Sequence, residues 1–140
     1  RAHALRLLDP AHPAHAEVLL ATMAEPKQGA PDDANARVIA ATSLLRAPAH
    51  RAKALDVLVA LLKRTDKIGT EAAVALAEQK DDRARARLVA DLATPSALRF
   101  RAASALVRLG HPEETRVLLS FADVDVRDGA ACTILSTPRP

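Results

Sequence analysis

The sequence predicts an all-α protein built as a right-handed α-solenoid, a row of short helical hairpins. A pattern of small and apolar residues recurs along the chain at intervals of about thirty residues. Apolar residues follow helical spacing, and no stretch shows the alternation of a strand. The chain has two Phe and no Tyr or Trp. Its interior must therefore consist of Ala, Leu and Val, which suit closely spaced helices.

The recurring pattern is R-x-x-A-A-x-x-L, with starts near residues 1, 37, 69, 99 and 127 and spacings of 36, 32, 30 and 28 residues. Offsets of three, four and seven place the two Ala and the Leu on one face of a helix. We call these the B helices. The copy at residue 1 is degenerate, and Gly69 replaces the Arg of the third copy, so we expect the third repeat to pack or bend differently. The residues assigned to this structural pattern are Arg37, Ala40, Ala41, Ala72, Ala73, Arg99, Ala102, Ala103, Arg127, Ala130 and Ala131.

A second set of helices, the A helices, is predicted between the B helices, over residues 13–25, 50–64, 82–93 and 112–122. Each has a stripe of apolar residues expected to face the interior. These residues are Val18, Leu19, Leu20, Leu55, Leu58, Leu62, Leu88, Val89, Leu92, Val117, Leu118 and Phe121. Pro13 and Pro112 suit the first turn of a helix, and Gly110 suits the end of one. The predicted N-caps are Asp66, Asp81, Ser96 and either Asp123 or Asp125.

We expect residues 1–140 to form a single repeat domain. The chain opens on a B helix without an A helix before it, which favours a longer array, because the ends of a repeat stack need capping. The net charge of +3 arises from 20 basic and 17 acidic residues without a long block of one sign, and no apolar run approaches the length of a membrane span. Cys132 is the sole cysteine, so an internal disulfide is excluded. These features favour a cytoplasmic protein.

The repeated pattern resembles HEAT-like repeats, most closely the short bacterial form also found in phycobilisome lyases. In that family a short turn containing Asp leads into V-R-x-x-A-A, as Asp125-Val126-Arg127 does here. The resemblance implies a scaffold for protein–protein interaction. It also implies two alternatives: a subunit of a bilin lyase-type complex, and a HEAT-like nucleic-acid-binding protein. The absence of Trp and Tyr disfavours base stacking and hence the second alternative. An inert spacer is a further possibility.

The face opposite the alanine pair of the B helices is the predicted binding surface, because the second helix of each solenoid hairpin usually lines the concave side. Its residues fall at offsets two, five and nine from each repeat start. Its charge changes sign along the chain, which suits a partner protein of mixed charge better than a phosphate backbone. The candidate partner-binding residues are Arg46, Glu71, Glu78, Arg101, Ser104 and Arg108. The alternative is a solvated face that binds nothing.

The repeat arginines Arg37, Arg99 and Arg127 could form a basic ladder for phosphate. A structural role is preferred, in which each reaches a turn carboxylate of a neighbouring repeat such as Asp33, Asp66 or Asp123.

The other residues that could bind a metal or take part in catalysis are better explained by structural roles. His12 and His15 lie three residues apart, with His3 earlier in the chain, but zinc needs three or four ligands. The pairs Asp32-Asp33 and Glu113-Glu114 suit helix starts, where carboxylates interact favourably with the helix dipole. Cys132 is expected to be a small, partly buried residue. We therefore predict no catalytic residue, metal or cofactor, and a partner that is another protein or another domain of the same protein.

Overall fold

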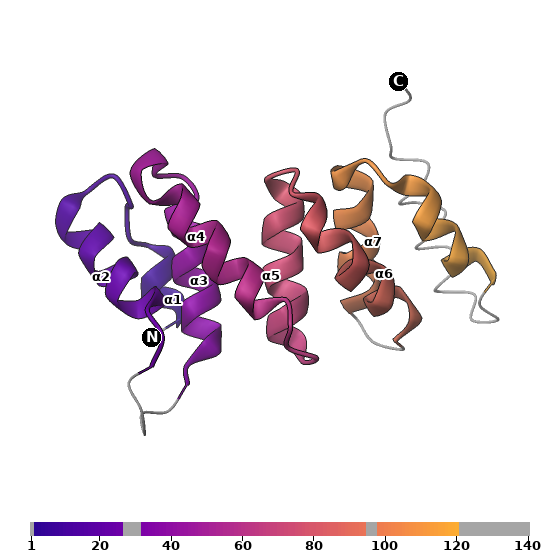
Figure 1. Ribbon diagram of the computed structural model, residues 1–140, viewed down its shortest axis with the longest axis horizontal. Coiled ribbons are helices and arrows are strands. Elements are labelled where there is room, and N and C mark those ends of the chain that lie inside the picture. The colour runs from indigo at the N-terminus through magenta and orange to yellow at the C-terminus, as the bar shows by residue number, and fades with distance from the viewer. Residues whose placement is uncertain (1, 27–31, 95–97, 121–140) are drawn as a thin grey trace. The chain divides into compact units, whose positions relative to one another are not determined.

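The computed structural model describes residues 2–26, 32–94 and 98–120 (Figure 1). Every regular element within these ranges is helical, which confirms the predicted all-α class. The longest of these helices has 14 residues, and none of them is long and apolar enough to cross a bilayer. The chain divides into two compact units, Arg1–Ile68 and Gly69–Pro140, and each is described by itself.

The first unit is organised around the B helix α3 (Ala34–Leu44). The short helix α1 (Ala2–Arg6) and the helices α2 (Pro13–Met23) and α4 (Pro48–Leu61) all pack against α3. A central position for α3 follows from its composition, since most of its residues are buried and many of them are small. The helix α5 (Lys67–Glu78) begins at the boundary between the units.

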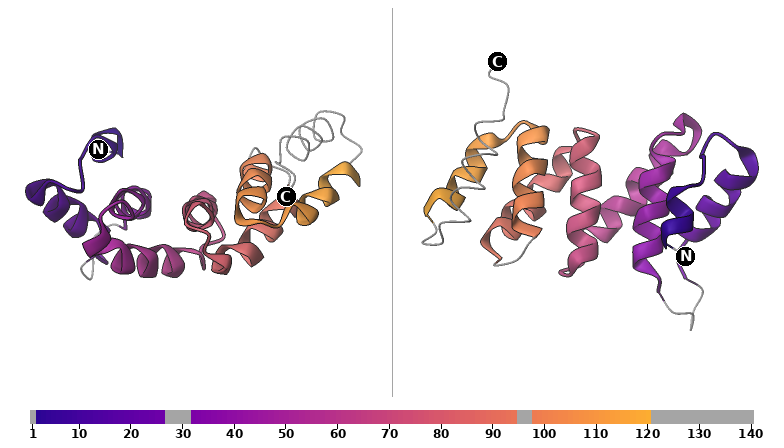
Figure 2. Two further views of the ribbon diagram at one scale, coloured as in Figure 1. Left: turned by 90° about the horizontal axis from the view of Figure 1, so that it is seen from above. Right: turned by 180° about the vertical axis from the view of Figure 1, so that it is seen from behind.

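The second unit contains most of α5, the 3₁₀ turn η1 (Asp82–Ala84), α6 (Arg85–Ala93), α7 (Leu98–Leu109) and the 3₁₀ helix η2 (Pro112–Ser120). The A helix α6 packs against α7, and η2 packs against both. In the view from above in Figure 2, α5 and α7 are seen nearly end-on beside one another, with α6 along one side of both. The segment predicted as a helix over residues 112–122 is thus a 3₁₀ helix as far as it is described.

The alanine pairs occupy the interior as predicted. The residues with no exposed surface at these positions are Ala40, Ala41, Ala72, Ala73, Ala102 and Ala103. The leucines at offset seven, Leu44, Leu76 and Leu106, are equally inaccessible. The degenerate copy at the chain start behaves differently, because Ala4 is exposed and Leu5 is the buried residue of α1. Ala130 and Ala131 lie outside the described residues.

The inward faces of the A helices differ from the predicted stripes. Leu19, Leu58, Leu88, Leu92 and Leu118 are buried as expected, whereas Val18 and Val117 are exposed. Leu20, Leu55, Leu62 and Val89 are half-buried, and Phe121 lies outside the described residues. The buried faces are completed by residues outside the predicted stripes: Ala16, Met23, Ala54, Leu61, Ala84 and Thr115. Only some members of a run of adjacent apolar residues can point inward, because a helix turns by about 100° per residue.

Several helix boundaries follow the predicted capping chemistry. Helices α2 and η2 begin at Pro13 and Pro112. Asp81 caps η1 by accepting the Arg83 N–H at 3.1 Å, and Asp66 accepts the Ile68 N–H at 3.0 Å in the first turn of α5. Asp33, which belongs to one of the predicted carboxylate pairs, accepts the Ala36 N–H at 3.0 Å at the start of α3. Ser96, Asp123 and Asp125 lie outside the described residues.

Gly110 ends α7 with a φ of +107°, and Lys80, thirty residues earlier, follows α5 with a φ of 60°. At both ends, backbone N–H groups that follow the helix donate back to carbonyls of its last turn. A Cβ added at Gly110 would meet nothing within 4 Å, so the demand for glycine comes from backbone conformation alone.

We therefore expect Gly110→Ala to lower the free energy of unfolding by about 1–2 kcal/mol. The matched control is Lys80→Ala, at the equivalent turn, where the backbone already accommodates an L-residue; its loss should be smaller. Urea denaturation of both variants measures the difference. An unchanged free energy of unfolding in Gly110→Ala would show that φ does not demand glycine at this turn.

Candidate functional site

Four of the residues predicted to bind a partner lie on α5 and α7 of the second unit as two rows of opposite charge. Glu71 and Glu78 lie on α5, and Arg101 and Arg108 lie on α7. Arg101 pairs with Glu71, one of its hydrogen bonds running from Nη2 to Oε2 at 2.7 Å. The Arg108 Nη1 donates to the Glu78 Oε1 at 3.1 Å. We call these four residues, together with Val74 and Ser104 between them, the charged strip.

The strip is accessible to solvent despite these ion pairs. The side chains of Arg101 and Arg108 are 49% and 56% exposed, and those of Glu71 and Glu78 are 22% and 45% exposed. Exposed pairs of this kind contribute about 0–1 kcal/mol each to stability. The strip can therefore exchange its internal pairs for contacts with a partner at small energetic expense.

Of the six candidate partner-binding residues, only Arg46 belongs to the first unit. It is exposed in the turn that follows α3. At the other two strip positions of this repeat, Ile39 is buried and Thr42 is half-buried, and α1 packs against α3. The second unit thus brings together five of the six predicted residues on α5 and α7, and Arg46 belongs to the first unit.

Further contacts in the second unit join residues one repeat apart. His111 Nε2 lies 2.7 Å from Asp82 Oδ1, and the Lys80 ammonium donates to the Arg108 carbonyl. Arg85 pairs with Glu114, its Nε lying 3.2 Å from Oε1. Sequence separations of 29, 28 and 29 residues match the spacing of 30 within the charged strip. The sequence analysis did not predict these contacts. Two of them, Asp82–His111 and Arg85–Glu114, join an acidic and a basic residue 29 positions apart, a spacing that can be found in the sequence.

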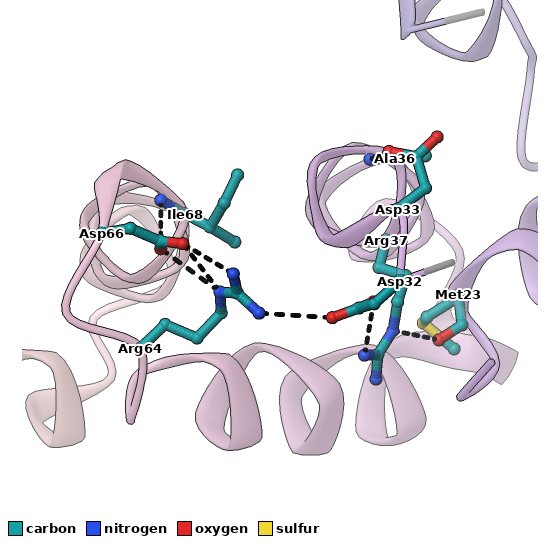
Figure 3. Close-up of polar contacts among 8 residues, drawn as sticks. All are labelled: Met23, Asp32, Asp33, Ala36, Arg37, Arg64, Asp66 and Ile68. Carbon is teal, nitrogen blue, oxygen red and sulfur yellow. Dashed lines mark hydrogen bonds and ion pairs between the residues drawn. The ribbon is translucent and has the colours of Figure 1, made fainter. Parts of the chain in front are cut away.

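The repeat arginine Arg37 has a structural role, but its partners differ from those predicted. Its guanidinium donates to Asp32 Oδ1 and to the Met23 carbonyl at the end of α2, each at 3.4 Å (Figure 3). Asp32 belongs to the turn directly before α3, so the carboxylate comes from the arginine's own repeat. A neighbouring repeat was predicted to supply it.

Arg64, which follows α4, makes the contact between turns that was expected of the B-helix arginines. Its Nη2 lies 2.6 Å from Asp66 Oδ2 and its Nη1 lies 3.2 Å from Asp32 Oδ2 (Figure 3). Hydrogen bonding to Asp66 raises the pKa of the Arg64 guanidinium, so it stays charged. A single side chain thereby links the turn before α3 to the turn before α5.

In the second unit a different arginine serves the repeat whose Arg position is Gly69. Arg87 of α6 donates to Thr70 Oγ1 at 3.3 Å and to the Asp91 carboxylate at 3.0 and 3.1 Å. Gly69 and Thr70 are both buried. At this repeat a guanidinium of the A helix thus contacts the start of α5. Arg99 is buried. Asp123, one of the predicted turn carboxylates, and the last repeat arginine, Arg127, lie outside the described residues.

The histidine pair lies at the start of α2. The rings of His12 and His15 have centroids 4.6 Å apart, and the His15 Nδ1 accepts the Asp9 N–H at 3.2 Å. In the described ranges, no group of three or more His, Cys, Asp or Glu residues is arranged to hold a metal ion. Cys132 lies outside those ranges.

In the predicted acidic pairs, Asp32, Glu113 and Glu114 contact nearby basic side chains. A backbone hydrogen bond and then the neighbouring His111 lower the pKa of Glu113, while Glu114 raises the pKa of the Arg85 guanidinium.

The hydrogen bond from the Arg83 side chain, helped by the Arg83 N–H, lowers the pKa of Asp81 below its ordinary value of 3.8.

The lowered pKa of Asp81 predicts an acid-sensitive contribution to stability. The contribution is present above the unfolded value of about 3.8 and is lost as the pH falls through the lower, folded value. We expect Asp81→Asn, which removes the charge but keeps a capping oxygen, to be destabilising at pH 6 and less destabilising at pH 3. Denaturant unfolding at both pH values checks this. A difference that persists unchanged at low pH would contradict it.

Comparison with known proteins adds no assignment, because no family model and no curated protein matches the chain.

Proposed function

We propose that this chain is a right-handed α-solenoid of HEAT-like hairpins that binds another protein, or another domain of its own protein, along the charged strip. In this role it acts as a scaffold and carries out no catalysis. The observation that supports the proposal is the strip itself, which presents an acidic row on α5 and a basic row on α7 at equivalent repeat positions. The alanine pairs on the opposite faces of the same helices are fully buried, so the strip is the face of these helices that a partner can reach.

The charge pattern supports a protein partner. Phosphate backbones favour one continuous basic track, whereas this strip balances two arginines against two glutamates. Complementary charges across an interface mainly set the encounter rate and the specificity of binding. A partner with its own mixed charges fits that role. Its binding should weaken as salt rises, because screened charges attract less.

The test compares capture of binding partners by three forms of the chain. Arg101→Glu with Arg108→Glu reverses the basic row and should abolish capture. Adding Glu71→Arg and Glu78→Arg to that variant restores both internal ion pairs with their charges exchanged, so its stability should return to about the wild-type value. Cross-linking with mass spectrometry identifies the captured proteins, and thermal unfolding confirms the fold.

The control variant is Arg51→Glu with Lys53→Glu, which changes the net charge by the same amount at exposed positions of α4. It should bind the same partners as the wild type. Partners retained by the row-reversed variant, or lost equally from the α4 control, would rule out the charged strip as the binding face.

A further inference from the structure

The arrangement of charge on the strip carries information about its occupant. Glu71 and Glu78 are seven residues apart on α5, and Arg101 and Arg108 are seven residues apart on α7. Seven residues of an α-helix rise by about 10 Å and return to nearly the same face. Because Glu71 pairs with Arg101 and Glu78 with Arg108, the two rows are in register. The strip is thus a rectangle of charge, acidic along one side and basic along the other.

The residue in the middle of each row is small and only half-buried. Val74 lies between the two glutamates on α5, and Ser104 lies between the two arginines on α7. Both side chains are small enough for another helix to approach the backbones of α5 and α7 closely. A helix lying along the rows would set its central stripe against Val74 and Ser104. Its flanks would then reach the charges on each side, as charged flanks do across a coiled-coil seam.

We infer that the occupant of the strip is an α-helix of the partner, laid along α5 and α7, with one basic and one acidic flank that each repeat every seven residues. The basic flank contacts Glu71 and Glu78, and the acidic flank contacts Arg101 and Arg108. An extended peptide fits less well, because its side chains recur on one face at every second residue and not at about 10 Å intervals along two flanks. This inference rests on the proposed function, since it names the class of partner for the same face.

The symmetry of the pattern decides which control peptide is informative. Exchanging the two flanks of the helix only reverses the direction in which it lies, because half a turn about the normal to the strip exchanges its sides. In a checkerboard helix, each flank alternates acidic and basic residues. Such a helix places like charges together at two of the four charged positions of the strip. This holds for both directions of the helix, and it still holds when the helix is moved along the strip by seven residues. The checkerboard helix is therefore the proper control at equal composition.

The experiment uses two alanine-based helical peptides of about three heptads each. In the row peptide one flank carries only Glu and the other only Lys; in the checkerboard peptide Glu and Lys alternate along both flanks. Fluorescence anisotropy at low ionic strength measures binding to the whole chain. We expect the wild type to bind the row peptide at least tenfold more tightly than the checkerboard peptide, with the difference shrinking as salt is added.

A double substitution converts the strip to the other pattern without changing its net charge. Glu71→Arg with Arg101→Glu exchanges one ion pair and leaves Glu78 and Arg108 in place, so that the strip itself becomes a checkerboard. Circular dichroism and thermal unfolding confirm that the fold is kept. This variant should prefer the checkerboard peptide by a similar factor and reject the row peptide.

Reversal of the preference between the two proteins supports the inference. Equal binding of the two peptides, binding of neither, or the same preference in both proteins overturns it. These failures are separate from failure of the proposed function. If row reversal abolishes partner capture while the peptides are not discriminated, the strip binds a partner whose contact is not such a helix.

Discussion

Ala103→Glu is expected to lower the free energy of unfolding by about 3 kcal/mol or more, the largest effect of any change considered. Ala103 of α7 has no exposed surface, and α6 packs against this helix. A glutamate there must either bury a carboxylate without a partner or push the two helices apart. A small domain is stable by about 5–15 kcal/mol, so the variant should lose a large share of its total stability.

The control for this substitution is Ala90→Glu in α6. Ala90 is exposed on a helix of the same unit, so the helix propensity and the net charge change equally while no charge is buried. Its unfolding free energy should stay within about 0.5 kcal/mol of the wild type. Urea denaturation followed by circular dichroism provides the comparison. A tolerated glutamate at residue 103 would contradict close packing through the alanine pairs.

The second large effect is expected at the Arg87–Asp91 pair. The two side chains are only 14% and 12% exposed, and Arg87 also contacts the buried Thr70. Asp91→Ala removes the carboxylate and leaves a guanidinium in a setting largely closed to water. Because removing one partner of a buried pair leaves a poorly solvated charge, we expect a loss of about 2–3 kcal/mol.

Replacing both partners together separates the ion pair from simple packing. Arg87→Met with Asp91→Leu should recover most of the stability lost in Asp91→Ala, since an apolar pair of similar size fills the space without a desolvated charge. Thermal unfolding of the single and double variants gives the coupling energy. A double variant as unstable as the single one would show that the contact to Thr70, and not the charge pair, dominates.

The B helices were predictable in detail because their pattern depends on local geometry. Ala40, Ala72 and Ala102 share one offset within successive repeats, and helical periodicity alone places each of them on the inward face. The caps at Asp66 and Asp81 and the stop at Gly110 were predictable for the same reason. Each depends on residues within one turn of the helix end.

The A helices were less predictable because their orientation depends on what they pack against. Val18 and Val117 are as apolar as their buried neighbours yet face solvent, whereas Thr115 and Asp91 face inward. Hydropathy ranks residues by type, but a helix can direct only one side toward its neighbour. In α6 that side includes Asp91, which the guanidinium of Arg87 makes compatible with burial.

The sequence by itself determined the helical class, the repeat period, the buried alanine pairs and the residues of the charged strip, because each of these follows from spacing along the chain. Only the tertiary structure decided which charges meet. It paired Arg101 with Glu71, gave Arg37 the carboxylate of Asp32, and let Arg64 join two turns. The physical reason is that a periodic pattern fixes the face on which a side chain lies, whereas the partner of a long, flexible arginine depends on distances between separate helices.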